Sequence, residues 1–144
     1  MTYLDIVNNI LKRLRERTVS TVNESSYSSL IAVLVNDAKE TVENAFQWSG
    51  LRTTLTATTT NGTFNYELNG SLNAVTVLDV INVTDNFFLK PKGSHEFNKL
   101  FLSNNVGTGS PYYYSFNGIS TDGDTKVDLY PIPDTEYTIR FNCV

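Results

Sequence analysis

The sequence predicts an α+β protein, with an N-terminal antiparallel helical hairpin followed by an antiparallel β-sandwich or barrel-like domain. Two stretches before Gly50 place apolar residues at the three-and-four spacing of a helical face. After Gly50 the pattern changes to period two and becomes rich in threonine, as is typical of strands. We expect residues 1–50 to form the helical hairpin and residues 51–144 the all-β segment, packed with the helices as one structural unit.

The first helix is expected to begin after Thr2, a good N-cap, with Asp5 near the positive end of the helix dipole. Its apolar face consists of Tyr3, Ile6, Val7, Ile10, Leu11 and Leu14. Its last turns carry a basic cluster, Lys12, Arg13, Arg15 and Arg17. The ordinary interpretation of this cluster is electrostatic stabilisation of a helix end on a solvated face.

A polar link, residues 18–26, leads to a second and longer helix. Its apolar stripe has a period near 3.6 and consists of Leu30, Ile31, Leu34, Val35, Ala38, Val42, Ala45 and Phe46. Its other face carries Asp37, Lys39, Glu40 and Glu43. Trp48 and Gly50 are expected to close the helix, because glycine suits the left-handed position past a helix end. The two helices should pack through their apolar stripes.

The β segment is expected to hold about seven short strands, separated by turn residues. Asn61-Gly62 predicts a hairpin between strands at 51–58 and 63–68, and Asn69-Gly70 turns the chain again. Residues 74–83 are rich in β-branched side chains and predict a central strand, followed after a turn at Asp85-Asn86 by residues 87–89.

The last third of the chain continues this pattern. A short helix is expected at 94–102, because Phe97, Leu100 and Phe101 share a face. Strands follow at 111–116, 126–130 and 136–142, with a hairpin turn at Asp122-Gly123 and a stiff bend at 131–134.

Composition restricts the function classes. The net charge of −4 argues against a general nucleic-acid binder, because duplex affinity comes largely from Lys and Arg neutralising phosphates. The charge is uneven, since residues 1–17 hold four basic and two acidic residues, a net of +2, and the remainder holds seven basic and thirteen acidic residues, a net of −6. Such asymmetry suggests a cationic end that meets an acidic partner surface.

The sequence contains few signals that indicate a cellular compartment. Cys143 is the single cysteine, so no internal disulfide forms. The first residues lack the pattern of a signal peptide, and the longest apolar run, 30–35, is too short to span a bilayer. We therefore expect an intracellular product that makes no contact with a membrane.

No catalytic, metal-binding or cofactor-binding site is predicted, and we expect no enzyme. His95 is the single histidine and lacks the second histidine of a zinc-protease helix. Asp122, Asp124 and Asp128 lack the ligand order and closing glutamate of a calcium loop, and a hairpin turn explains them. No serine lies in a nucleophile elbow, and no glycine-rich phosphate loop precedes a helix.

The run Tyr112-Tyr113-Tyr114 is the most unusual stretch. On a strand, Tyr112 and Tyr114 would share one face and Tyr113 the other. Ordinary packing, a subunit interface, and stacking against a carbohydrate or base all remain open, because tyrosine serves each of them. We treat Tyr112, Tyr113 and Tyr114 as a candidate subunit interface.

Several segments, in this order, resemble the head-to-tail adaptor (connector) family of tailed bacteriophages, as found in short-tailed phages. They are residues 3–16, residues 34–45 followed by Trp48 and residues 51–54, residues 109–114, and residues 129–134. The similarity covers nearly the whole chain, although no segment is a catalytic fingerprint.

The resemblance implies a structural virion protein made in the host bacterial cytoplasm. Such adaptors form a ring, usually dodecameric, between the portal protein at the special capsid vertex and the tail tube or nozzle protein. The ring extends the channel through which genomic DNA passes without sequence-specific binding. Similar proteins commonly continue into C-terminal helices, whereas residues 141–144 end a predicted strand, and this departure leaves open any portal contact that such helices would make.

In such a ring, Lys12, Arg13, Arg15 and Arg17 are candidates for contact with the portal, a neighbouring subunit or the channel. The main alternative is another virion β-module, such as a tail, decoration or glycan-binding protein that uses the tyrosine strand. A small DNA-binding regulator built on the helices is a further alternative, disfavoured by the acidic remainder of the chain.

Overall fold

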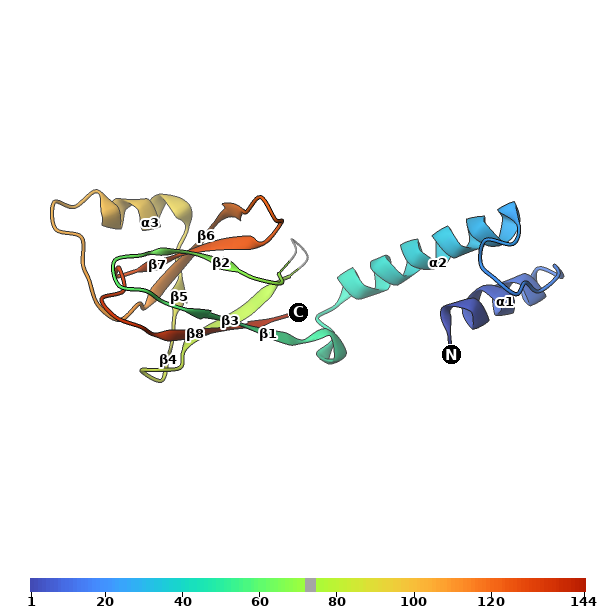
Figure 1. The fold of residues 1–144 in the computed structure, drawn as a ribbon, viewed down its shortest axis with the longest axis horizontal. Helices are drawn as coiled ribbons and strands as arrows, with labels where there is room; N and C mark the ends of the chain where they lie inside the picture. The colour runs from blue at the N-terminus through green and yellow to red at the C-terminus, as the bar shows by residue number, and fades with distance from the viewer. Residues whose placement is uncertain (72–74) are drawn as a thin grey trace. The chain divides into compact units, whose positions relative to one another are not determined.

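The computed structural model describes residues 1–71 and 75–144, which divide into two units, Met1–Trp48 and Ser49–Val144. The first unit holds two α-helices. Within the described residues, the second holds two sheets, one 3-10 turn and one further helix. The chain is therefore α+β, as the sequence predicts (Figure 1).

Helix α1, Tyr3–Arg13, begins as its sequence predicts. The backbone N–H of Asp5 donates to Thr2 Oγ1 at 3.2 Å, and the backbone N–H of Thr2 donates to the Asp5 carboxylate at 2.8 Å. This reciprocal capping box satisfies two of the backbone donors that a helix start leaves without partners. The hydrogen bonds from Thr2, the backbone one foremost, lower the pKa of Asp5.

Helix α2, Ser26–Ala45, is capped at its start by Ser25, and its end differs from the expected one. Phe46 is already extended, and Gly50 lies in the 3-10 turn η1, Ser49–Leu51. The Trp48 indole Nε1 donates to the Val42 carbonyl oxygen at 2.8 Å. Because this side chain satisfies a carbonyl of the last turn, the helix ends without a left-handed glycine.

The two helices pack against each other around a small core formed by Val7, Leu11, Ile31 and Ala32. The Tyr3 hydroxyl donates to the Ala32 carbonyl oxygen at 2.6 Å. The link between the helices is held by Asn8, whose side-chain amide donates to and accepts from the backbone of Val19 at 3.0 and 2.9 Å. These contacts fix the start of α2 against α1.

The second unit contains two four-stranded sheets. One has the order β1-β8-β3-β4, with β1 at Thr53–Thr58, β8 at Thr138–Cys143, β3 at Val77–Asn82 and β4 at Phe87–Phe88. The other has the order β2-β7-β6-β5, with β2 at Asn65–Leu68, β7 at Thr125–Tyr130, β6 at Tyr113–Ile119 and β5 at Lys90–Pro91. Among the described strands, neither sheet closes on itself into a barrel.

One hydrophobic core draws on both sheets. Val80 of β3 and Phe141 of β8 contribute from the first sheet, and Tyr114 of β6 and Leu129 of β7 from the second. Buried and less buried residues alternate along β8, as the period of two requires. The predicted central strand is confirmed within its described part, because β3 lies between β8 and β4; Ala74 lies outside the described residues.

The predicted hairpin across Asn61-Gly62 is wrong. The turn forms, with Gly62 at a φ of 79°, but β1 pairs with β8 and β2 pairs with β7. Thr59 donates through its backbone N–H to the Tyr137 carbonyl at 2.9 Å, and the Phe64 carbonyl accepts from Leu129 at 2.8 Å. The chain therefore crosses from one sheet to the other at this turn. The residues Asn61-Gly62 make the chain reverse direction, but they do not decide which strand each flanking strand pairs with.

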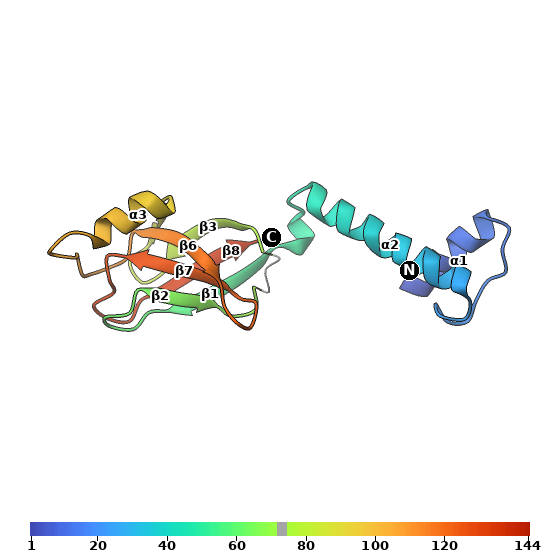
Figure 2. The ribbon, with the colours of Figure 1, turned by 90° about the horizontal axis from the view of Figure 1, so that it is seen from above.

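Strands β5 and β6 pair in parallel, which the expectation of an antiparallel β domain did not include. Helix α3, Ser94–Phe101, lies between them in the chain and confirms the predicted short helix. A parallel pair needs such a crossover connection, because the chain must return to the same end of the sheet. Figures 1 and 2 show α3 beside the sheet that contains β6 and β7.

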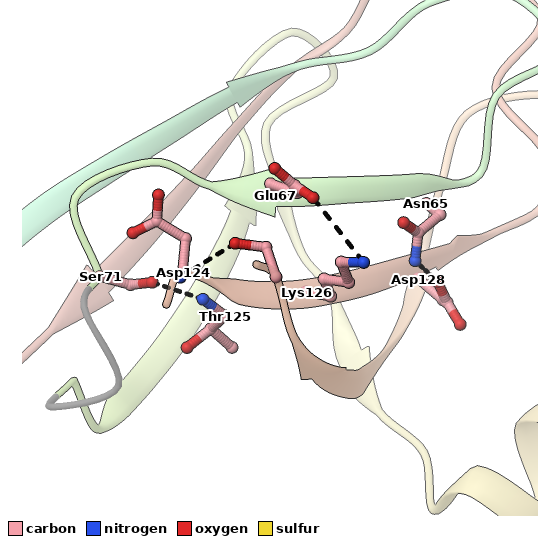
Figure 3. A network of polar contacts seen from close by, with 8 residues as sticks. Asn65, Glu67, Ser71, Asp124, Thr125, Lys126 and Asp128 are labelled. Atoms are coloured by element: carbon pink, nitrogen blue, oxygen red, sulfur yellow. Dashed lines mark hydrogen bonds and ion pairs between the residues drawn. The ribbon is translucent and has the colours of Figure 1, made fainter. Parts of the chain in front are cut away.

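Polar side chains join β2 to β7 and the turns beside them (Figure 3). Glu67 and Lys126 form an ion pair at 3.8 Å, and the Asn65 amide donates to the Asp128 carboxylate. The Asp124 carboxylate accepts from the backbone N–H of Gly70 at 3.0 Å. The side chains of Glu67, Asp124 and Asp128 therefore stabilise the sheet and its hairpin turn.

Candidate assembly surfaces

An apolar groove of about 320 Å³ opens in the helical unit, between α1 and the first half of α2. Its walls include Ile10, Leu14, Tyr27, Leu30, Leu34 and Ala38. Leu30 and Leu34 are 54% and 57% exposed. Exposed apolar patches rimmed by polar residues are typical of protein–protein contact sites.

The groove exists because α1 is much shorter than α2. Helix α1 has 11 residues and α2 has 20, so α1 covers only part of the long apolar stripe. Of the predicted stripe, Ile31 and Val35 pack against α1, whereas Leu30, Leu34 and Val42 are exposed. The expectation that the stripe is used in packing the two helices together is therefore wrong for much of its length.

The second half of α2 is exposed on nearly all sides. Residues 36–45 are all exposed except the half-buried Glu43. The helical period places Ala38, Val42 and Ala45 on one face, and Phe46, 67% exposed, follows them. The Phe46 ring contacts the Trp48 ring edge-on at a centroid distance of 5.4 Å. An isolated helix of this composition would expose its apolar face to water.

The basic cluster lies at the C-terminal end of α1 and just beyond it. All four side chains, Lys12, Arg13, Arg15 and Arg17, belong to exposed residues. The ion pairs found among the described residues are Lys39–Glu43, Lys92–Glu96 and Glu67–Lys126, and none of them includes this cluster. The structure brings the four cations to one end of the helical unit, where Lys12 acts electrostatically on Asp5 and no ion pair found in residues 1–71 and 75–144 includes the cluster.

Arg15 occupies an unusual backbone position. Its φ is 61°, in the left-handed region, and its backbone N–H donates to the Lys12 carbonyl at 3.1 Å. The next N–H, from Glu16, donates to the Leu11 carbonyl at 2.9 Å. These two bonds form a Schellman motif, in which this position is usually glycine. An arginine here costs free energy relative to glycine.

An aromatic surface lies on the β unit, where α3 meets β7. The Phe101 ring contacts Phe64 and Tyr130 at centroid distances of 4.9 and 5.6 Å. Tyr112 extends this surface through ring contacts with Tyr113 at 4.6 Å and Tyr130 at 6.3 Å. Lys92 Nζ lies 4.3 Å from the centre of the Tyr113 ring, in a cation–π contact.

The three consecutive tyrosines lie in different environments. Tyr114 is buried in the core between the sheets, Tyr113 is half-buried, and Tyr112 is 43% exposed. Tyr112 precedes β6, and its ring contacts the Tyr113 ring. Tyr112 and Tyr114, which were expected to share a face, therefore differ in burial.

The residues that could act in catalysis or metal binding are dispersed. His95 is exposed on α3, and in residues 1–71 and 75–144 no three His, Cys, Asp or Glu side chains group as metal ligands. No helix in the same residues has the length and apolarity needed to cross a bilayer. The surfaces described above are suited to contact with other macromolecules.

Sequence reasoning did not identify the groove or the outer part of the aromatic surface. The groove residues Leu14, Leu30 and Leu34 were expected to be internal. The available signal was the length of the second helix, which exceeds what the first can cover. No pattern in the sequence placed Lys92 and Phe64 on the aromatic surface, because their aromatic neighbours come from distant segments of the chain.

Comparison with known proteins gives one family. The family model described as SU10 adaptor protein matches residues 1–144, the full length of the sequence. The search of curated proteins gave no match. The resemblance to phage head-to-tail adaptors is thereby confirmed.

Proposed function

The chain belongs to the SU10 adaptor protein family, and we propose from this membership that it is the ring-forming subunit that joins the portal to the tail of a tailed bacteriophage. The family is one of structural phage adaptors and not an enzyme family. The observation that carries the proposal is the match over all 144 residues, because it includes both the helical and the β unit.

Ring formation is supported by the unpaired surfaces of the helical unit. A closed ring needs two different surfaces on each subunit that fit each other head to tail. The apolar groove between α1 and α2 and the exposed second half of α2 are two such surfaces. We propose a ring of twelve copies around a channel that extends the portal.

The charge distribution is consistent with a channel that binds the passing DNA only weakly. Sequence-independent attraction of DNA depends on Lys and Arg near the phosphates. Residues 18–144 carry a net charge of −6, so a lining drawn from them would bind DNA weakly. DNA then slides through during ejection without sequence-specific contact.

The aromatic surface on the β unit is proposed as a contact between neighbouring subunits of the ring. Tyr112 and Tyr113 supply large rings with hydroxyl groups, a combination common at protein interfaces. Tyr114 would support this contact from the core. The arrangement of the helices as an antiparallel hairpin, and of the two mostly antiparallel sheets as a sandwich, is part of the same proposal.

Deletion of the gene from the phage that encodes the chain tests the proposed role. We expect heads that package DNA, and free tails that do not join to them. Electron microscopy of lysates would show both. The wild-type gene supplied on a plasmid should restore joined particles. Tailed, infectious particles without the gene would contradict the role, since the adaptor would then be dispensable for joining.

A further inference from the structure

We infer that the open edge of β1 takes an extended, acidic segment of another virion protein as an additional strand of its sheet. Strand β1 lies at the edge of the sheet β1-β8-β3-β4, and within the described residues it pairs with β8 alone. The inference rests on the proposed ring, because the symmetry of the ring bears on whether the added strand comes from a second copy or from a different protein.

The backbone of β1 directs every second residue away from β8. The backbone N–H of Thr59, just past the end of β1, donates to the Tyr137 carbonyl at 2.9 Å, and alternate residues of an antiparallel strand bond to the same neighbour. The N–H and C=O groups of Thr54, Thr56 and Thr58 therefore point to the open side. All three residues are exposed, and no hydrogen bond found in the described part of the chain gives these backbone groups a partner on that side.

The other sheet edges carry the features with which proteins prevent unwanted strand pairing, namely short length, charge and proline. Strand β4 has two residues, β5 consists of Lys90 and Pro91, and β2 contains Glu67. Strand β1 has six residues, no charged residue, no proline and an unbroken register with β8. Of the described edges, it is the one best suited to receive a strand.

Ring symmetry favours a different protein as the source of that strand. A β1–β1 pair requires a two-fold axis between copies, and no such axis relates the neighbours of a head-to-tail ring. The other described edges of a neighbouring copy, β2, β4 and β5, offer two or four residues each and carry the protective features. A six-residue edge is therefore better matched by an extended segment of another virion protein.

Two arginines beside the edge determine the chemistry of the segment. Arg52 directly precedes β1, and Arg140 lies opposite Thr56 in the register of β1 with β8. Both arginines are exposed, and none of the ion pairs found among the described residues includes either of them. Asp79, on the next strand β3, already accepts a hydrogen bond from the Asn142 amide at 2.5 Å. The edge therefore favours a segment that carries an acidic residue.

The register gives this acidic residue its place. A strand added to β1 would put one side chain opposite Thr56, on the same exposed face as Arg140. Two strand spacings, roughly 10 Å, separate its backbone from that of Arg140, and an extended arginine and a glutamate together bridge this distance over the small threonine. The ion pair adds mainly specificity, because the backbone hydrogen bonds of the added strand supply the affinity.

Amide hydrogen exchange at single-residue resolution tests the added strand, with the full-length protein measured free and in purified phage particles. In the free protein, Ala57 should be protected by β8 while Thr56 and Thr58 exchange rapidly. In particles, the exchange of Thr56 and Thr58 should slow by at least about a hundredfold. Exchange that stays rapid in particles would overturn the inference.

Photo-cross-linking in purified particles identifies the source of the strand. The probe is Thr58→Cys labelled with a benzophenone maleimide, and the buried Cys143 does not compete for the label. We expect a cross-link to a segment of another virion protein that contains Asp or Glu, and Thr121→Cys, in the exposed turn before β7, should not label that segment. A cross-link from Thr58→Cys to a second copy of this chain would instead contradict the inference.

A proline at the edge tests the function of the added strand. Thr56→Pro removes an N–H on the open side and leaves the ladder to β8 in place, whereas Thr56→Val keeps that N–H. In phage that lack the gene, Thr56→Val supplied on a plasmid should restore joined particles, and Thr56→Pro should give at least about tenfold fewer. Arg140→Glu, which keeps the backbone intact, should also lower the yield, and Lys99→Glu on α3 is its control.

The outcomes separate this contact from the adaptor role. Wild-type yields of joined particles from both Thr56→Pro and Arg140→Glu would overturn the inference and leave the adaptor role intact. Joined particles that form without the gene would contradict the proposed function itself.

Discussion

The backbone N–H of Arg15 donates to the carbonyl of Lys12 at 3.1 Å while Arg15 itself holds a left-handed φ of 61°. The helix therefore ends with a cation in a position that favours glycine. Residues held in sparsely populated backbone conformations cluster at functional sites. Stability and assembly should accordingly respond in opposite directions to a change at Arg15.

Replacing Arg15 by glycine should raise the free energy of unfolding of the helical unit by about 1 kcal/mol, because the left-handed conformation costs glycine nothing sterically. Urea denaturation followed by circular dichroism at 222 nm measures this. Arg17→Gly is the matched control, since Arg17 is also exposed and has no positive φ. If Arg15→Gly is no more stable than Arg17→Gly, the strain argument is wrong.

Acidification should weaken the start of α1 through Asp5. Its hydrogen bonds from Thr2 lower the pKa of Asp5 below 3.8, so the ionised carboxylate stabilises the folded state. That contribution is complete above pH 3.8 and is lost as the pH falls through the lowered pKa. The difference in thermal midpoint between wild type and Asp5→Asn should be constant from about pH 7 to 5 and then shrink. A difference that grows on acidification would contradict the assignment.

Two phenylalanines on the same sheet should differ sharply in their effect on stability. Phe141 is fully buried in the core shared by the two sheets, whereas Phe88 on β4 is exposed. Phe141→Ala should cost about 3–5 kcal/mol through lost burial and a cavity. Phe88→Ala should change stability by less than about 1 kcal/mol. Chemical denaturation of both variants checks this, and equal effects would contradict the observed core.

The Cys143 thiol should react slowly with alkylating reagents in the native protein. It is buried on β8, and burial, the largest cause, raises the pKa of the thiol. Fewer thiolates form and reagents reach them only on opening, so labelling at pH 8 should be slower by roughly a hundredfold than in urea. Mass spectrometry follows the reaction. The exposed thiol of Val33→Cys provides the fast reference, and equal native rates would show that Cys143 is accessible.

Local signals in the sequence predicted the elements well. Thr2 and Asp5 predicted the start of α1, and the structure confirms their reciprocal bonds. Asp122-Gly123 predicted the turn between β6 and β7, which pair antiparallel. These features depend on residues close together in the chain, so periodicity and capping rules describe them adequately.

Partnerships between distant segments were predicted less well. Asn61-Gly62 identified a turn, but Thr59 and Phe64 bond to different sheets, so β1 and β2 do not form a hairpin. The parallel pairing of β5 with β6 likewise depends on the crossover through α3. Leu34 illustrates the limit at the candidate site, because its apolar character fits a buried face equally well whether the partner is α1 or another chain.

The most direct measurement is the binding of the purified protein to purified portal rings of the same phage, by co-sedimentation and electron microscopy of the product. The proposal predicts a defined ring added to one end of the portal, with the copies in regular contact. A folded protein that stays monomeric and leaves folded portal rings bare would contradict the adaptor role and favour a separate ligand-binding function for the β unit.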